Sequence, residues 1–410
     1  MTSKSPGLVA NIRALPRAVW ILCIGTFINR FGGFVAVFLV LFLSREGYSP
    51  ALAGLAVAAF GLGSIGGSAL GGYLADRIGR SEAIVLSMLT TAAATIALLL
   101  VHGLPAVLLI SGIVGLTQQV VRAPTTALMA DLVPPQGRVA AMGVMRFFIN
   151  AGFALGPAAA GFLADRSFPL LFGLDAATSV IFAVIALLLL PRGAPRLERR
   201  EVRAEGTRTI LADRGFLLFL AATLAASMVY LQATTTFPLW VTRSGYSNAV
   251  YGYLVGLNGG IIMLLELLLI SVTQRLPARP VIAGGFLLVG VGFALTLGAH
   301  TLPLLAITVL VWTLGEMTAF PMSTAYVADV APVHLRGRYQ GAWGLMWSLG
   351  LMLGPGVGGW LFDANPNLLW ILCGVVGAIA AALVLLGPSA RVSAPNAALT
   401  SEAPVSSPPA

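Results

Sequence analysis

Charged side chains stand inside long apolar stretches of this chain, and their types suggest proton chemistry. Glu266 and Glu316 are acids in such stretches, and Arg30 and Arg122 are arginines in others. An ionisable group at mid-membrane depth costs about 2.5 to 3.5 kcal/mol on insertion scales, so it tends to face a cavity or a partner. A carboxyl group holds its proton more tightly in an apolar environment and releases it more easily beside an arginine. The two glutamates are therefore candidate proton carriers, and the arginines leave room for an anionic substrate.

Each acid also has a plainer interpretation, a permanent ion pair that holds two helices together. Arg146 would be the partner of Glu266 if their two helices touch. Asp175 is interpreted as a helix-start or packing residue. For Glu266 and Glu316 both interpretations stay open.

Polar and aromatic side chains in the same stretches are candidates for contact with a substrate or a proton. They are Asn29, Tyr230, Gln232, Trp343 and Trp347, the last two one helical turn apart. Aromatic rings with a few hydrogen-bonding groups suit an amphipathic organic compound. The alternative for the aromatic residues is core packing and anchoring at the membrane interface.

The elements that position these residues follow from composition. Of the 410 residues 58% are hydrophobic and 10% are charged, whereas a soluble domain carries about 25% charged residues. A membrane-spanning helix needs about 20 apolar residues. The sequence therefore predicts an all-α membrane protein with twelve transmembrane helices, at 18–43, 51–74, 82–102, 105–130, 139–164, 169–190, 216–240, 248–272, 281–299, 302–328, 339–362 and 367–387.

An internal repeat divides the chain. A shift of 198 residues aligns 126–165 with 324–363 without a gap, and 14 of these 40 positions are identical, including glycines, prolines and aspartates. Parallel repeats of this kind are one transporter architecture. The predicted organisation is an N-terminal six-helix bundle over 1–190, a cytoplasmic central loop over 191–215, a C-terminal six-helix bundle over 216–387 and a disordered cytoplasmic tail over 388–410. A short surface helix is the alternative for part of the central loop.

The basic residues predict an orientation. Of the 24 lysines and arginines, 18 lie on the side of the N-terminus, 3 lie in the loops of the other side and 3 lie within the spans. Cytoplasmic loops collect such residues. We therefore expect a multi-pass protein of the cell (inner) membrane with both termini in the cytoplasm. The net positive charge is explained by the basic residues of cytoplasmic loops, so no nucleic-acid partner is expected.

The loop after the second span carries a charged motif. It reads Gly72-x3-Asp76-Arg77-x-Gly79-Arg80. Glycine permits a tight turn, the carboxylate can accept hydrogen bonds from a neighbouring helix N-terminus, and the last arginine can reach an acid on another loop. Such contacts can hold one conformation and break in another. The alternative is a turn with positive charge that only sets the topology.

Two spans carry matching glycine patterns. In 139–164 the pattern is Gly143-x8-Gly152-x3-Gly156-Pro157-x3-Gly161. Glycines four residues apart share a helix face and permit close packing, and a proline can bend the helix. The copy in 339–362 consists of Gly341, Gly350, Gly354, Pro355, Gly358 and Gly359. The alternative is generic helix packing.

These motifs, the twelve spans and the repeat resemble the major facilitator superfamily. The charged loop is similar to that family's signature between its second and third helices. The glycine pattern is similar to the signature of its drug:proton antiporters, Gly-x8-Gly-x3-Gly-Pro-x2-Gly-Gly, with Ala160 in place of one glycine. The resemblance implies that spans 1, 4, 7 and 10 surround a central cavity. It also implies that Asp76 and Arg80 form a conformational latch, with Asp131 as the partner of Arg80, that holds the outward-facing state.

Two departures from the family pattern matter. In the second half Gln274 and Ala278 replace the loop acid and arginine, so the latch is expected to be asymmetric. Drug antiporters often carry an arginine early in the fourth span, where this chain has Ser111 and Gly112. Arg122 lies about ten residues later, so the family arginine's role is not transferred to it.

The function predicted is secondary active transport by alternating access, with export of a small drug-like or amphipathic compound in exchange for protons. The alternative is a proton-coupled uptake symporter for a sugar, an organic acid or an amino acid. A membrane-embedded enzyme would need a cluster of acids, histidines or lysines at one membrane face, and none is seen. A Walker motif cannot occur because Lys4 is the only lysine. We expect no cofactor and no metal, and a monomer in the lipid bilayer.

Overall fold

The computed structural model describes residues 15–134, 137–191, 205–332 and 335–387. Over these residues the chain is helical, and twelve segments are long and apolar enough to span a membrane. This confirms the predicted fold class, with span ends within a few residues of those predicted. The central loop contains a short helix, α10 (Glu205–Ala212), and the next helix begins at Arg214. The predicted tail 388–410 lies outside the described residues.

The helices of the first half run from Arg17 to Leu189. They are α2 (Arg17–Phe31), α3 (Val35–Arg45), α4 (Pro50–Ile78), α5 (Arg80–Leu100), α6 (Leu104–Val120), α7 (Arg122–Leu132), α8 (Arg138–Arg166) and α9 (Phe168–Leu189). Those of the second half are α11 (Arg214–Tyr230), α12 (Gln232–Thr235), α13 (Phe237–Arg243), α14 (Asn248–Thr273), α15 (Ala278–Ala294), η2 (Leu295–Gly298), α16 (Leu302–Val330), α17 (Arg336–Ala364) and α18 (Pro366–Leu386).

Spans 1, 4 and 7 are interrupted, which the sequence analysis did not predict. Span 1 breaks between α2 and α3 at Gly32 and Gly33, and the carboxylate of Asp175 on α9 accepts hydrogen bonds from the first amides of the new helix, at 2.9 Å from Phe34 and 3.0 Å from Val35. Asp175 is thus a helix-start residue, but for α3 rather than for its own helix. In span 4 the break lies three residues before Pro124, which has no amide hydrogen to donate.

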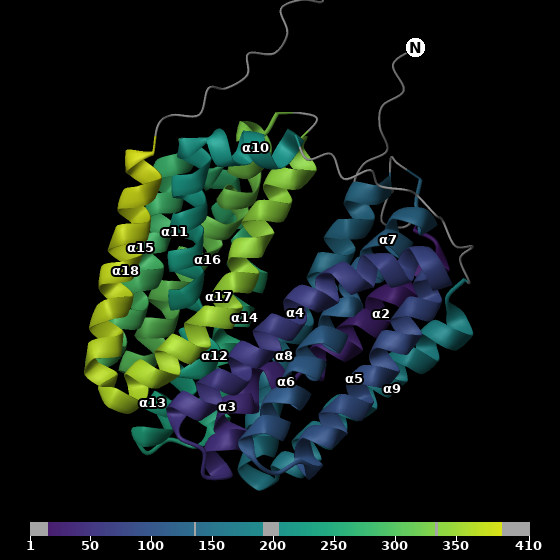
Figure 1. Ribbon diagram of the computed structural model, residues 1–410, viewed down its shortest axis with the longest axis horizontal. Coiled ribbons are helices and arrows are strands. Elements are labelled where there is room, and N and C mark those ends of the chain that lie inside the picture. Colours follow the sequence, from purple (N-terminus) through teal and green to yellow (C-terminus); the bar gives the residue numbers. More distant parts are fainter. Residues whose placement is uncertain (1–14, 135–136, 192–204, 333–334, 388–410) are drawn as a thin grey trace, which may run out of the picture.

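The helices form two groups that follow the two halves of the sequence. Figure 1 shows the first half in purple to blue and the second half in green to yellow. We call the end that holds α10 and the start of α2 the α10 end, and the opposite end, where α3 and α13 finish, the distal end. The groups meet through α4 with α17 and through α8 with α14. Their ribbons converge towards the distal end and diverge towards the α10 end (Figure 1).

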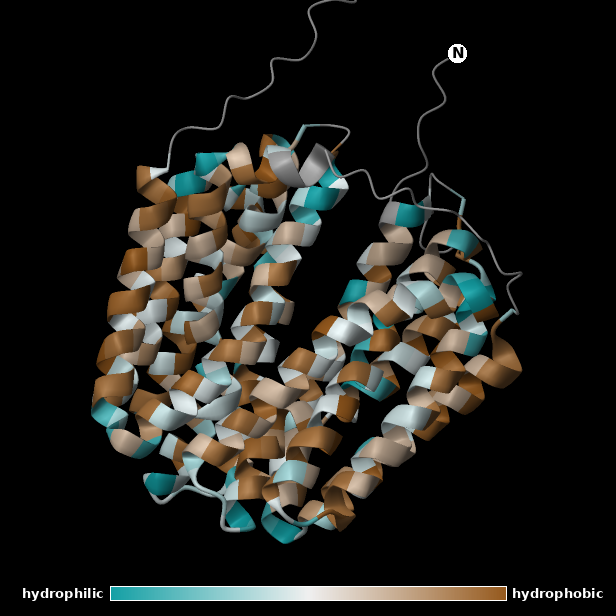
Figure 2. Cartoon of the chain, in the orientation of Figure 1, coloured by the Kyte–Doolittle hydropathy of each residue, from teal (hydrophilic) through white to brown (hydrophobic). Residues whose placement is uncertain are grey.

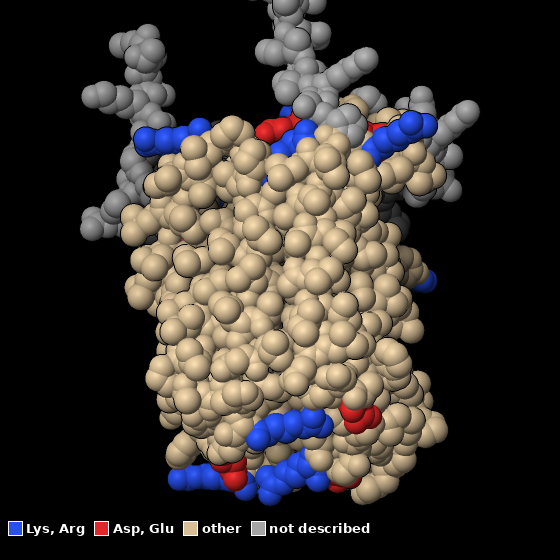
Figure 3. Space-filling view, turned by 90° about the vertical axis from the view of Figure 1, so that its left-hand side faces the viewer, with Lys and Arg blue, Asp and Glu red and all other residues tan. Residues whose placement is uncertain are grey.

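The outer surface has the polarity of a membrane protein. Figure 2 shows hydrophobic residues along the outward helices and hydrophilic residues mainly at the two ends. On the face in Figure 3 the charged side chains gather at those ends, with a broad band of other residues between them. Large apolar side chains stay exposed along the membrane-spanning helices, such as Leu264 of α14 at 70%. This surface suits contact with lipid.

Candidate functional site

Glu316 lies at the middle of α16 and is held by two side chains from other helices. The hydroxyl of Tyr230, at the end of α11, donates to Oε1 at 3.0 Å. The amide of Asn258 on α14 donates to Oε2 at 2.9 Å and also contacts Thr313 Oγ1 at 3.0 Å. Both partners can hydrogen-bond the carboxyl group in its neutral and in its ionised form. Asn258 was missed in the sequence analysis, although an amide in the middle of an apolar span is itself a signal.

Aromatic rings cluster around Tyr230, which donates to this carboxylate. The ring of Tyr230 lies 5.1 Å from that of Phe320 and 5.9 Å from that of Trp347, centre to centre. Trp343 and Trp347 are in edge contact at 6.4 Å. Within the described residues, the buried indole nitrogens of both tryptophans have no hydrogen-bond partner. The predicted aromatic residues are therefore brought together with the acid, and two hydrogen-bond donors remain unused.

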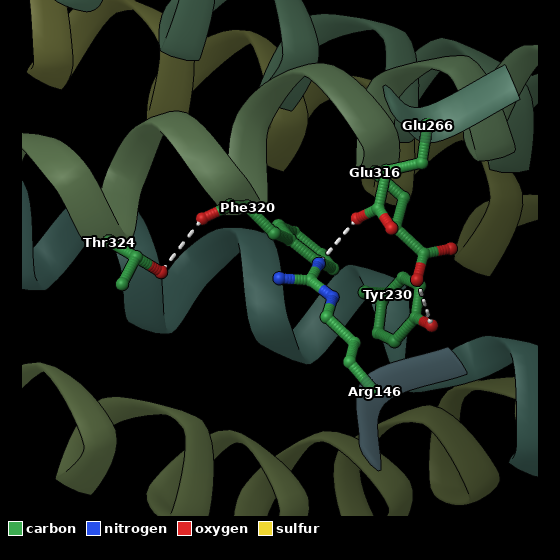
Figure 4. A network of polar contacts seen from close by, with 6 residues as sticks. All are labelled: Arg146, Tyr230, Glu266, Glu316, Phe320 and Thr324. Carbon is green, nitrogen blue, oxygen red and sulfur yellow. Dashed lines mark hydrogen bonds and ion pairs between the residues drawn. The ribbon is translucent and has the colours of Figure 1, made fainter. Parts of the chain in front are cut away.

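A second acid, Glu266, joins the two groups of helices. Nη2 of Arg146 on α8 lies 2.6 Å from Oε1 of Glu266 on α14, and the side chain of Arg146 is 60% exposed. Figure 4 shows Arg146 directed at Glu266 and Tyr230 directed at Glu316. Spans 5 and 8 do touch, so the ion pair considered for Glu266 exists.

Arg30 and Arg122 lie in the first group of helices. Arg30, in the last turn of α2, sits over the ring of Phe153 at 5.5 Å, and its Nε is buried without a hydrogen-bond partner in the described part of the chain. Arg122 begins α7 and is exposed. Neither arginine makes an ion pair with any acid that the structure describes.

Two predicted candidates, Asn29 and Gln232, make no hydrogen bond to Glu316, Glu266 or the two arginines. The amide of Asn29 contacts Met88 Sδ at 3.3 Å and Ser179 Oγ at 3.5 Å, both in its own group. Gln232 is 3% exposed and donates to the backbone carbonyl of Gly354 at 3.0 Å. In the described structure these amides instead contact other groups inside the helix packing.

The charged loop after α4 contains an ion pair inside the first group. Arg80, the first residue of α5, contacts Asp131 near the end of α7. Gly79 between α4 and α5 has φ of 102°, which favours glycine. Arg77 contacts the ring and hydroxyl of Tyr73, and a Cβ at Gly72 would meet open space.

Asp76 differs from the expectation that it caps a neighbouring helix. It is exposed, and no described residue donates a hydrogen bond to it. The reason is that α4 continues to Ile78, which leaves Asp76 on the outer face of its last turn. The second half has no counterpart of the loop ion pair among the described residues, in line with the asymmetry expected.

The glycine motifs make close contacts on both faces of two helices. On α8, a Cβ at Gly152 would come within 2.7 Å of Arg30 Cβ on α2, and one at Gly161 within 2.5 Å of the Asn248 carbonyl on α14. The neighbouring Gly156 packs against Phe31 of α2.

The copy on α17 repeats this arrangement. Gly350 and Gly354 pack against Ser227 and Met228 of α11, Gly358 against Gln232, and Gly359 against Pro50 and Gly54 of α4. Pro157 and Pro355 lie inside continuous helices. Gly143 and Gly341 have no neighbour in the space a Cβ would fill. Each motif helix thus packs against one helix of its own half and one of the other half.

The fold and the site define a helical membrane transporter, in which two repeated groups of helices meet around charged residues at mid-membrane depth. The chain belongs to the Major Facilitator Superfamily, whose sequence profile matches residues 22–275 and 250–408. It is a transporter and not an enzyme.

Similar proteins agree with this assignment. An uncharacterized MFS-type transporter, YttB of Bacillus subtilis, is 30% identical over 85% of this chain and 89% of its own length. The multidrug resistance protein MdtH of Cronobacter sakazakii is 28% identical over 84% and 88%. Among solved structures, the nucleoside transporter NupG shares the fold with a TM-score of 0.80 at 14% identity, over 90% of this chain and 99% of that one.

Proposed function

We propose that the chain exports a small amphipathic organic compound in exchange for protons, with Glu316 as the proton carrier. The observation that carries this proposal is the setting of Glu316. It lies at the centre of a transmembrane helix and is held by Tyr230 and Asn258, and Tyr230 in turn packs against Phe320 and Trp347. An ionisable group with partners that can change as helices move is suited to exchange a proton. The similarity to a multidrug resistance protein supports export.

Alternating access is the mechanism we propose. The close glycine contacts between the two groups, Gly161 with Asn248 and Gly359 with Pro50, lie near the distal end. The arginine distribution supports a cytoplasmic α10 end and cytoplasmic termini, in the cell membrane. The described conformation then corresponds to an inward-facing state, in which the distal end is closed. The pair of Arg80 and Asp131 is formed in this conformation and lies within one half, so it is not specific to the outward-facing state that the family resemblance implied. The chain acts as a monomer in this proposal.

The ion pair between Arg146 and Glu266 has a defined place in this cycle. It links α8 to α14, which belong to different groups. When the groups move to open the distal end, the pair either breaks or serves as the pivot. In both cases its contribution is to the conformational step, and proton exchange remains with Glu316.

Proton flux in proteoliposomes tests the proposal. A pH-sensitive dye is trapped inside, and cationic, neutral and anionic amphipathic compounds are screened with the wild type, Glu316→Gln and Glu46→Gln, an exposed acid outside the spans as the matched control. We expect proton movement opposite to the compound, lost in Glu316→Gln and kept in Glu46→Gln. Movement in the same direction as the compound would establish an uptake symporter instead. Antiport that persists in Glu316→Gln would remove Glu316 from proton exchange.

A further inference from the structure

Arg30 and Arg122 carry two positive charges that the described protein does not neutralise. Arg30 is 13 residues from the start of α2, so it lies about 20 Å from the α10 end at 1.5 Å per residue. Its guanidinium group lies over the face of Phe153, which is itself 43% exposed. The Nε atom is buried and has no hydrogen-bond partner within the described residues. A donor in this state is costly unless a ligand supplies the acceptor.

Arg122 is the second arginine near this depth of the first group of helices. It begins α7, ten residues before the end of that helix, and its side chain is exposed. An exposed arginine at this depth is expensive against lipid, so it faces the space between the groups of helices. Helix α7 packs against α2, and ten residues of helix place Arg122 about 15 Å from the α10 end, close to the depth of Arg30.

The acids of the spans are engaged elsewhere. Glu266 pairs with Arg146, Glu316 accepts from Tyr230 and Asn258, and Asp175 accepts from the backbone of α3. Neither Arg30 nor Arg122 forms an ion pair with a described acid, and none of these three carboxylates is free to balance them. An anion that enters with the substrate would balance them.

The side chains around Arg30 indicate which chemical group would accompany the anionic group of a substrate. Phe27 and Phe31 are stacked at 6.1 Å, and Phe148 lies in edge contact with Phe27 at 6.2 Å. With Phe153 these rings form an apolar wall beside Arg30, made of α2 and α8. Such a wall favours the face of an aromatic ring over a hydrated sugar.

We propose that Arg30 and Arg122 form an anion-binding subsite, and that the transported compounds include aromatic carboxylates. The carboxylate oxygens accept hydrogen bonds from both guanidinium groups, and the aromatic ring packs on the phenylalanine wall. This inference rests on the proposed function, because it assigns a substrate class to the same transport site.

Binding to the purified full-length protein tests the subsite without any need for transport. The probes are benzoate and 2-naphthoate with their primary amides, which match them in shape and lack the charge, and 2-naphthylmethylamine as a cation. Isothermal titration calorimetry measures the affinity of each probe for the wild type, Arg30→Lys, Arg30→Gln and Arg122→Gln. Arg45→Gln is the control, an arginine at the distal end of α3 that lies over the ring of Phe168 at the start of α9. Thermal unfolding verifies that each variant is folded.

We expect the carboxylates to bind more tightly than their amides, and 2-naphthoate more tightly than benzoate. Each guanidinium group supplies a charge-assisted hydrogen bond, so each Arg→Gln change is expected to weaken carboxylate binding about 10- to 150-fold. Arg30→Lys should retain part of the affinity, and Arg45→Gln all of it. Equal affinity for carboxylates and amides, preference for the amine, or unchanged binding in Arg122→Gln would overturn the proposal.

The two proposals fail separately. Proton exchange with cationic compounds, together with no carboxylate binding, would keep antiport and remove the anion subsite. Carboxylate binding that depends on Arg30 and Arg122, together with no compound-driven proton movement, would keep the subsite and remove antiport.

Discussion

Asp165 of α8 accepts a hydrogen bond from the backbone N–H of Asn248, the first residue of α14, at 2.8 Å, and a second from the next amide at 3.0 Å. The contact crosses from one group of helices to the other at the distal end. A carboxylate at a helix N-terminus is favoured by the unpaired amides and the helix dipole. This contact therefore stabilises the conformation in which the distal end is closed, and it must break for that end to open.

Replacement of this carboxylate is expected to favour distal opening. An N-cap contact is worth about 0.5–2 kcal/mol, so Asp165→Ala should shift the ratio of closed to open molecules about 2- to 30-fold. Spin labels are attached to cysteines placed at Glu46 and Asn367, in distal segments of the two halves. The distance between the labels, measured by pulsed electron paramagnetic resonance, would increase when the distal end opens.

The repeat supplies a matched control for this experiment. Asp363 occupies the corresponding position on α17, but it has no hydrogen bond with a described residue, and Ser49 caps α4 instead. Asp363→Ala should leave the distance distribution unchanged. An equal shift in both variants would contradict the account of Asp165.

A side chain at Gly161 is expected to block the same closure. The added Cβ of Gly161→Ala would stand 2.5 Å from the Asn248 carbonyl oxygen, so α8 and α14 would have to separate. Overpacking costs about 1–3 kcal/mol, which corresponds to about a 5- to 150-fold loss of the closed state and a comparable fall in transport rate. Initial rates in proteoliposomes measure the effect. Gly143→Ala, on the same helix with open space at its Cβ, should transport as the wild type does.

The pair of Arg80 and Asp131 is expected to matter for transport more than for stability. An ion pair near the surface contributes about 0–1 kcal/mol to folding, and Arg80→Ala should barely change the unfolding temperature. Transport should fall, because the pair fixes α5 against α7 in the loop motif. The exchanged variant Arg80→Asp with Asp131→Arg should recover activity, and Arg77→Ala should have little effect. Loss of activity without recovery in the exchanged pair would argue against a latch made of these two charges.

Glu266 and Glu316 are expected to respond differently to the same substitution. In Glu266→Gln the link to Arg146 is weakened, and because that arginine is largely exposed the rate should fall by less than about tenfold. Proton counterflow should remain coupled to the compound. In Glu316→Gln the counterflow should disappear. Paired measurements of compound flux and internal pH separate the two cases, and the reverse pattern would assign the proton to Glu266.

Much of the fold could be predicted from the sequence, because each of the twelve long apolar runs has to form a membrane-spanning helix in a bilayer. The orientation of side chains around each helix was harder to predict. Asn29 and Gln232 stand in spans that are apolar on every side, so no polar face indicates which way they point. Both turned out to be packed within their own groups.

The remaining surprises depend on contacts between distant segments. The role of Asp175 depends on the break at Gly32 and Gly33, and that of Asn258 depends on the approach of α14 to α16. Neither neighbour is close in sequence. Asp165 and Asp363 are repeat copies, yet only Asp165 caps a helix in the described structure.

Proton release on binding is the measurement that addresses the central claim most directly. The detergent-purified protein in weakly buffered solution is mixed with a compound that the flux screen identifies as transported, and the change in pH is recorded with an indicator dye. If compound and proton compete through Glu316, binding to the wild type releases protons, and binding to Glu316→Gln releases none while the compound still binds. Release of the same number of protons by the wild type and Glu316→Gln would contradict the account.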